Sequence, residues 1–173
     1  MKRVMVIGGP GSGKSTLARA LGRITGLPVY HMDHIHHLPG WVQRPTAERV
    51  AMAREVEARE EWIFEGGLSA TYESRSARAD LLIHLDLPMP VRLWRVAKRI
   101  WRYRGEVRPD MADGCPEQLD WEFIWWIVST ARKNSARDRA LGAARPDGTT
   151  VTLRSQAEID AYLARLVPVP GAA

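Results

Sequence analysis

Residues Gly8 to Thr16 constrain this chain more than any other stretch, because their spacing fits a motif that fixes a local fold and a ligand class. They read Gly-Gly-Pro-Gly-Ser-Gly-Lys-Ser-Thr, which matches G-x-x-x-x-G-K-[ST], the P-loop signature. The apolar run Val4–Ile7 before them predicts a buried strand, and a helical pattern follows from Ser15 to Thr25. Strand, glycine-rich loop and helix form a phosphate cradle in this order, so the sequence predicts binding of ATP or GTP.

The residue types in the motif have chemical reasons. Its glycines let backbone N–H groups approach phosphate oxygens and allow the positive φ angles of an anion nest, and the helix start adds its dipole. We expect Lys14 to reach the β- and γ-phosphates, Ser15 to be a ligand of Mg²⁺, and Thr16 to add a phosphate contact. The predicted nucleotide-binding residues are Gly8, Gly9, Pro10, Gly11, Ser12, Gly13, Lys14, Ser15 and Thr16.

Length and cysteine content indicate one intracellular domain. The 173 residues are enough to bury a core without disulfides, and the single Cys115 excludes a disulfide framework within the chain. No long apolar segment is present, so we expect neither a signal peptide nor a membrane span, and a cytoplasmic location. Residues 1–167 are predicted to form the domain, and 168–173 a disordered tail.

Strand and helix patterns alternate along the chain. A helix between two strand patterns is the βαβ unit of an α/β fold. Ser155 and Glu158 form a capping box that opens the last helix. The predicted strands are 4–7, 27–31, 62–65, 81–86 and 150–153.

Two carboxylates follow strand ends, where α/β sheets place their ligands. Asp33 lies just past the second strand, and Glu65 ends the third beside the P-loop, where it can hold the water shell of Mg²⁺. Residues 34–44 predict an irregular loop, and Thr46 is expected to cap a helix to about Glu60. Residues 34–60 therefore predict a mobile substrate-binding flap, with a plain surface helix as the alternative.

Four histidines in this region raise the question of a metal site. His34 and His37 are spaced i, i+3, but a zinc site would need a third ligand and a defined helix. We therefore interpret His31, His34, His36 and His37 as part of a polar loop beside the acceptor pocket.

Arginines form a stripe on the helix predicted from Val91. Its apolar face comprises Leu93, Trp94, Ala97, Ile100 and Trp101, and its basic stripe comprises Arg92, Arg95, Arg99 and Arg102. Four of the positive charges behind the net charge of +5 therefore lie in one stripe, an arrangement that suits neutralisation of a triphosphate. A basic helix face exposed to solvent would give the same pattern.

A Pro/Gly-rich segment follows this helix. Residues 102–120 have the composition of a lid, in which Arg108 could close onto phosphates. An amphipathic helix marked by Trp121, Ile124, Trp125 and Val128 comes next.

With these elements placed, the chain resembles the adenylate-kinase-like P-loop kinases. More narrowly, it resembles the bacterial family called DNA topology modulation proteins. The narrow resemblance spans nearly the whole chain and rests on 28–33, 39–41, Arg75 with 78–80, 93–99, 103–105 and 108–123.

The resemblance implies a three-layer fold with a five-stranded parallel sheet flanked by helices, a flap near Asp33 and a lid after the arginine helix. It places Arg95 on the adenine and Arg99 on the phosphates, and it puts Glu65 where an Asp is usual. The narrow family often has Asn at the position of Gly67 and Arg at that of Ala70. These departures leave Arg75 and Arg78 as the expected contacts to the acceptor.

The leading hypothesis is an ATP-dependent kinase that uses Mg²⁺ and phosphorylates a nucleotide or similar small acceptor, with Lys14, Arg95 and Arg99 stabilising the transferred group. A second hypothesis is an ATP-binding regulatory protein that acts on DNA or a partner. We do not expect direct nucleic-acid binding, because the basic stripe is explained by the nucleotide. A third is a kinase of a non-nucleotide alcohol, with Asp33 receiving the proton. Both monomer and homodimer stay open.

Overall fold

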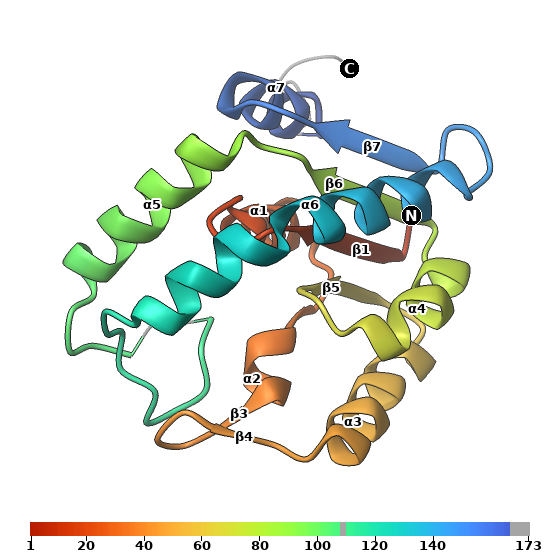
Figure 1. The fold of residues 1–173 in the computed structure, drawn as a ribbon. Helices are drawn as coiled ribbons and strands as arrows, with labels where there is room; N and C mark the ends of the chain where they lie inside the picture. Colours follow the sequence, from red (N-terminus) through yellow and green to blue (C-terminus); the bar gives the residue numbers. More distant parts are fainter. Residues whose placement is uncertain (108–109, 167–173) are drawn as a thin grey trace.

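A five-stranded parallel sheet forms the centre of the computed structural model, which describes residues 1–107 and 110–166. The strand order is β2-β5-β1-β6-β7, and every neighbouring pair is parallel (Figure 1). The predicted strands and the α/β fold class are confirmed. The strands are β1 (Arg3–Gly8), β2 (Val29–His31), β5 (Trp62–Glu65), β6 (Leu81–Leu85) and β7 (Thr150–Leu153).

Alternate residues of β1 face two separate cores, one on each side of the sheet, so the molecule has three layers with the sheet between two layers of helices. Val4 and Val6 pack with Leu17 of α1 (Lys14–Thr25) and Ile159 of α7 (Gln156–Leu166). Met5 and Ile7 pack on the opposite side, beneath α3 (Thr46–Ala58) and α4 (Tyr72–Arg78). The helix α6 (Trp121–Ala143) also contacts β1 and β6 and crosses the sheet in Figure 1.

Between β2 and β5 the chain is more regular than predicted. Residues expected to be an irregular loop form the helix α2 (Met32–His36) and a hairpin of β3 (His37–Leu38) and β4 (Val42–Gln43). Met32 and Ile35 are buried, which explains why this turn of helix forms. The capping prediction for Thr46 was wrong, because α3 has Pro45 at its N-cap position and no side-chain cap.

The capping box of the last helix is confirmed. The backbone N–H of Glu158 donates to Ser155 Oγ at 3.1 Å, and the N–H of Arg154 donates to Glu158 Oε2 at 2.8 Å. The first bond satisfies a donor that the helix start leaves without an intrahelical partner, and the second ties the Glu158 side chain to the residue before the N-cap position.

The tryptophans on the predicted apolar faces of α5 (Met89–Arg102) and α6 point outward. Trp101 is 83% exposed and Trp125 is 72% exposed, whereas Val96 of α5 and Ile127 of α6 are buried. The helices are where the periodicity predicted them, but the residues that contact the core lie on other faces.

The remaining elements join the sheet to these helices. A 3₁₀ turn η1 (Ser69–Thr71) leads into α4, and residues 103–107 and 110–120 connect α5 to α6 with two isolated bridges. In the described part of the chain, no helix combines the length and apolar character that a membrane crossing requires.

Candidate active site

The P-loop connects β1 to α1 with the backbone that its glycines predict. Gly8, Gly11 and Gly13 have φ angles of 144°, 76° and 96°, and Gly13 is the N-cap of α1. Ser12 Oγ is buried and has no hydrogen-bond partner within the described residues. A buried hydroxyl without a partner inside an anion nest fits a site for phosphate oxygens.

Side chains at the end of β5 meet the start of α1. Ser15 Oγ donates to Glu65 Oε1 at 3.0 Å, and His31 Nδ1 lies 2.8 Å from the same oxygen. Glu65 is only 2% exposed. Lys14 Nζ donates to the carbonyl oxygen of Gly9 at 3.3 Å and so stays folded over the loop.

This donor set fits Mg²⁺ bound with nucleotide phosphates. A hydroxyl and a carboxylate are the oxygen ligands and water acceptors that this ion prefers, with waters and phosphates completing its shell. No three His, Cys, Asp or Glu side chains in the described residues converge on a protein-only metal site.

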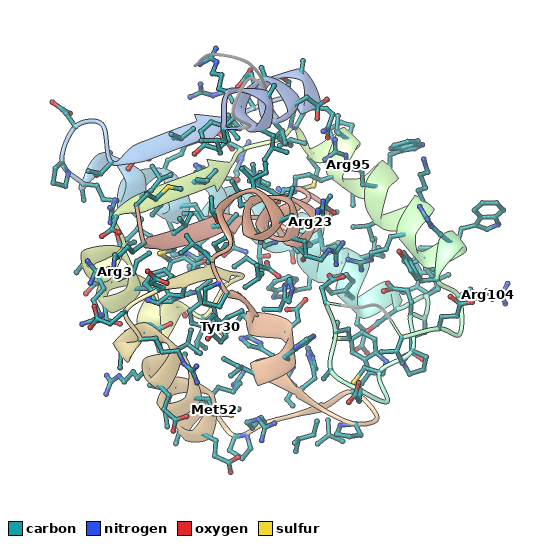
Figure 2. All side chains as sticks on the ribbon, turned by 180° about the vertical axis from the view of Figure 1, so that it is seen from behind. Arg3, Arg23, Tyr30, Met52, Arg95 and Arg104 are labelled. Carbon is teal, nitrogen blue, oxygen red and sulfur yellow. The ribbon has the colours of Figure 1, made fainter. Side chains whose placement is uncertain are left out.

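Arg95 lies beside the P-loop. Its Nη1 donates to the carbonyl oxygen of Ser12 at 3.2 Å, and its Nη2 donates to Gln156 Oε1 at 2.7 Å. Figure 2 shows Arg95 near α1, with Arg104 far out at the periphery. Arg95 therefore joins the P-loop to the start of α7.

Arg99 lies one turn further along α5 and contacts the segment between α5 and α6. Its Nε and Nη2 donate to Glu117 Oε1 at 3.1 and 3.0 Å, and Glu117 is buried. Arg99 thus connects the arginine helix to that segment, while Arg102 is exposed beside Tyr103.

Arg92 is the residue whose place the sequence did not reveal. It is only 5% exposed, and its Nε donates to the carbonyl oxygen of Pro10 at 3.0 Å. A Cβ at Gly9 would lie 1.9 Å from Arg92 Nη2, and one at Gly11 would lie 2.3 Å from the carbonyl oxygen of Arg92. The first turn of α5 therefore packs directly on the P-loop backbone.

The predicted acceptor-binding residues separate into two places. Arg75 is fully buried on α4, where its Nη1 donates to the carbonyl oxygen of Gly66 at 3.0 Å. Arg78 donates through Nε to the carbonyl oxygen of Glu57 at 2.6 Å, at the end of α3. Asp33 is half-buried on α2, and Arg108 lies outside the described residues.

Arg75 is a buried side chain, and some of its hydrogen-bond donors have no partner among the described residues. Its Nε and Nη2 are buried without a hydrogen-bond partner in the described residues, and its guanidinium lies over the rings of Phe64 and Tyr72, 4.8 and 5.3 Å from their centroids. Burial lowers the pKa of Arg75 to about 10, so the side chain is a cation at neutral pH. A buried cation with free donors fits the recognition of an anionic group.

The structure places two further residues, Arg137 and His36, near Arg75. Arg137 of α6 donates through Nη2 to Tyr72 Oη at 3.1 Å. His36 of α2 has a buried Nε2, and burial together with nearby Arg49 lowers its pKa to about 4. The sequence predicted His36 in a polar loop beside the acceptor pocket, but the burial of its Nε2 and the contact of Arg137 with Tyr72 depend on how α2, α4 and α6 pack.

The hairpin β3–β4 and the segment between α5 and α6 contact each other. Gly40 N donates to the carbonyl oxygen of Gly114 at 2.9 Å, and Trp41 Nε1 donates to that of Pro116 at 3.0 Å. Cys115 is buried between them, with Sγ 3.3 Å from the carbonyl oxygen of Leu38. The two segments predicted as flap and lid thus meet at their tips.

Solved structures with a similar fold are kinases. Shikimate kinase from Acinetobacter baumannii, in complex with shikimate, aligns with a TM-score of 0.63 and 15% identity over 96% of this chain and 91% of that chain. A sugar kinase from Janibacter aligns with a TM-score of 0.51 and 17% identity over 98% and 99% of the two chains. Shikimate kinase from Bacteroides thetaiotaomicron gives a TM-score of 0.57 and 16% identity, with 95% of both chains covered. The chain therefore has the fold of P-loop kinases.

Sequence comparison adds one relative. The uncharacterized protein YqaC of Bacillus subtilis is 27% identical over 132 residues, which cover 72% of this chain and 70% of YqaC. No protein-family model matches the chain.

Proposed function

We propose that the protein is a small-molecule kinase that transfers the γ-phosphoryl group of ATP to an anionic acceptor. The observation that carries the proposal is the hydrogen bond between Ser15 and Glu65, which joins the P-loop helix to the end of β5. A phosphate cradle beside a buried carboxylate that can hold Mg²⁺ would provide the charge neutralisation that phosphoryl transfer needs. The fold shared with shikimate and sugar kinases supports the same class of reaction.

The P-loop residues would hold the ATP phosphates, and Arg95 would lie against the adenine. Lys14 would stabilise the transferred group, and Arg99 would join it when the segment 102–120 closes as a lid. Ser15 and, through water, Glu65 would hold Mg²⁺, which when bound neutralises charge on the phosphates.

The acceptor would bind between α2, α4 and the lid. In this proposal Arg75 recognises an anionic group of the acceptor, because it is a buried cation with free donors. Residues 34–60 would act as the flap over this pocket. If the acceptor presents an alcohol, Asp33 would receive its proton as the oxygen attacks the γ-phosphorus.

The narrower kinship with the DNA topology modulation proteins is part of this proposal. It rests on the residues quoted above, above all 108–123. The proposed kinase function does not require DNA binding.

The proposal is tested by ADP release from Mg-ATP against nucleoside monophosphates, nucleosides and small acidic alcohols. We expect one acceptor class to stimulate ADP release, and Lys14→Ala to abolish the stimulation. Asp33→Asn should abolish transfer to an alcohol while leaving ATP affinity nearly unchanged. Slow turnover that no acceptor stimulates would instead favour a regulatory ATP-binding protein.

A further inference from the structure

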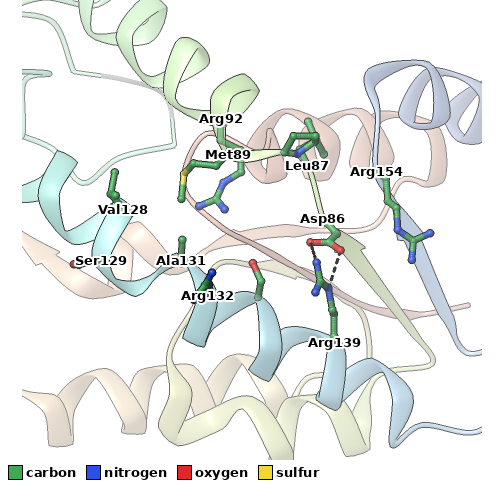
Figure 3. Close-up of a pocket in the computed structure, with 12 residues that line it drawn as sticks. Asp86, Leu87, Met89, Arg92, Val128, Ser129, Ala131, Arg132, Arg139 and Arg154 are labelled. Atoms are coloured by element: carbon green, nitrogen blue, oxygen red, sulfur yellow. Dashed lines mark hydrogen bonds and ion pairs between the residues drawn. The ribbon is translucent and has the colours of Figure 1, made fainter.

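A basic cavity lies next to the site described above and shares Arg92 with it. It has a volume of about 650 Å³ and is bounded by the loop from β6 to α5, the first turn of α5, the middle of α6 and the end of β7 (Figure 3). No residue of the P-loop lines it. Four arginines line this basic pocket: Arg92, Arg132, Arg139 and Arg154.

Arg92 is the deepest of these cations and separates the basic pocket from the P-loop. Its side chain is almost entirely buried, and Figure 3 shows its guanidinium between α5 and α6. Among the described residues its hydrogen bond is the one from Nε to the carbonyl oxygen of Pro10. Its two Nη atoms donate no hydrogen bond to any residue in the described ranges, so they are available to a ligand.

The charges around the basic pocket are unbalanced. Asp86 is the acidic residue among those lining it, and Arg139 already pairs with it at 3.0 and 3.3 Å. Nearby Asp138 pairs with Arg137 at 2.9 Å. Arg132 and Arg154 carry no ion pair within the described residues, so the lining holds two unpaired rim cations besides Arg92, with Arg154 beyond the Asp86–Arg139 pair (Figure 3).

The walls of the basic pocket are partly apolar. Leu87, Met89 and Val128 line it together with the hydroxyls of Ser129 and Ser135. A cavity of this size is within the range of small-ligand sites, about 300–1,000 Å³. Guanidinium groups match phosphate oxygens in charge and geometry.

We propose that the basic pocket binds a small phosphorylated molecule at a site separate from the P-loop. Its phosphate lies on Arg92, Arg132 and Arg154, and its carbon skeleton lies on the apolar wall. Because Arg92 also holds the carbonyl of Pro10, the ligand contacts a residue that supports the nucleotide loop. The proposal does not depend on whether the protein transfers a phosphoryl group.

Inorganic pyrophosphate, titrated calorimetrically in magnesium-free buffer, is a suitable probe. The background is the Lys14→Ala chain, in which the P-loop is weakened for anions. We expect Arg132→Gln with Arg154→Gln to weaken pyrophosphate binding about tenfold or more, since each removes a charge-assisted bond. The matched control is Arg23→Gln with Arg165→Gln, which removes two exposed helix arginines elsewhere and should leave the binding unchanged.

Three results would overturn the proposal. One is equal binding in both double variants. Another is no pyrophosphate binding at roughly 5 mM, which corresponds to a binding free energy weaker than about 3 kcal/mol. The third is tighter binding of a short single-stranded oligonucleotide than of pyrophosphate, lost in the same Arg132/Arg154 variant, which would assign the surface to nucleic acid. Thermal unfolding of each variant checks that both double variants are folded.

Discussion

Ser15 Oγ and Glu65 Oε1 lie 3.0 Å apart and join the first turn of α1 to the end of β5. We predict that Glu65→Gln keeps the fold but weakens Mg²⁺ binding, so that more Mg²⁺ is needed, because the amide is neutral and cannot order the ion's water shell as a carboxylate does. The expected loss of ATP turnover is about 10- to 100-fold at fixed Mg²⁺, partly restored at high Mg²⁺. Steady-state kinetics over a magnesium series measures this, with Glu65→Asp expected to retain more activity. An unchanged magnesium dependence in Glu65→Gln would show that Glu65 does not help to hold Mg²⁺.

Arg75 and Arg78 lie on the same short helix but have different surroundings. We predict that Arg75→Lys raises the acceptor KM about 10- to 100-fold and leaves ATP affinity unchanged, because a charged hydrogen bond is lost. Arg78→Gln, the matched control, should lower stability by about 1 kcal/mol without changing the acceptor KM, because Arg78 bonds the end of α3. Equal changes of the acceptor KM in the two variants would contradict the assignment of Arg75 to acceptor binding and of Arg78 to stability.

The hydrogen bond from Trp41 to Pro116 joins the hairpin β3–β4, which we propose as part of a flap, to the segment between α5 and α6, which we propose as a lid. We predict that Trp41→Phe, which keeps an aromatic ring but removes the indole N–H donor, raises acceptor-independent ATP hydrolysis about 2- to 5-fold relative to transfer, because water enters a less tightly closed site. Parallel assays of phosphate release and of phosphorylated acceptor measure the ratio. A control with Trp125→Phe, an exposed side chain of α6, should leave the ratio unchanged.

His36 makes stability depend on pH. Burial lowers its pKa from 6.5 to about 4, so between these values the unfolded chain binds a proton that the folded chain excludes. Above pH 6.5 His36 is neutral in both states and costs no stability, whereas as pH falls toward 4 the unfolded state is increasingly favoured because it alone binds the proton. Urea unfolding at several pH values should therefore show stability falling over this window, and falling less steeply in His36→Gln. An identical slope in the variant would rule out His36 as the cause.

The strands and the P-loop could be predicted because their signals are local. Val4–Ile7 is a continuous apolar run, and the glycine spacing matches a motif whose loop geometry is known. The buried faces of α5 and α6 could not be predicted, because periodicity shows which residues share a face but not which face packs on the core. Trp101 and Trp125 point outward although each lies on a predicted apolar face.

The candidate site was predictable where it follows strand ends. Ser15 and Glu65 come together because the P-loop and the end of β5 share one edge of the sheet. The burial of Arg75 and the contact of Arg92 with the P-loop depend on how α4 and α5 pack, which no spacing in the sequence encodes. The hairpin β3–β4 was missed for a similar reason, since its two-residue strands form only with their partner in place.

The central claim is that the γ-phosphoryl group leaves ATP for a small acceptor. The most direct measurement incubates the protein with Mg-ATP labelled at the γ-phosphorus and a mixture of small nucleotides and hydroxy acids, and separates the labelled products. We predict a new labelled acceptor in the wild-type reaction and none with Lys14→Ala. Label that appears only in inorganic phosphate, at the same rate with and without the mixture, would contradict the claim.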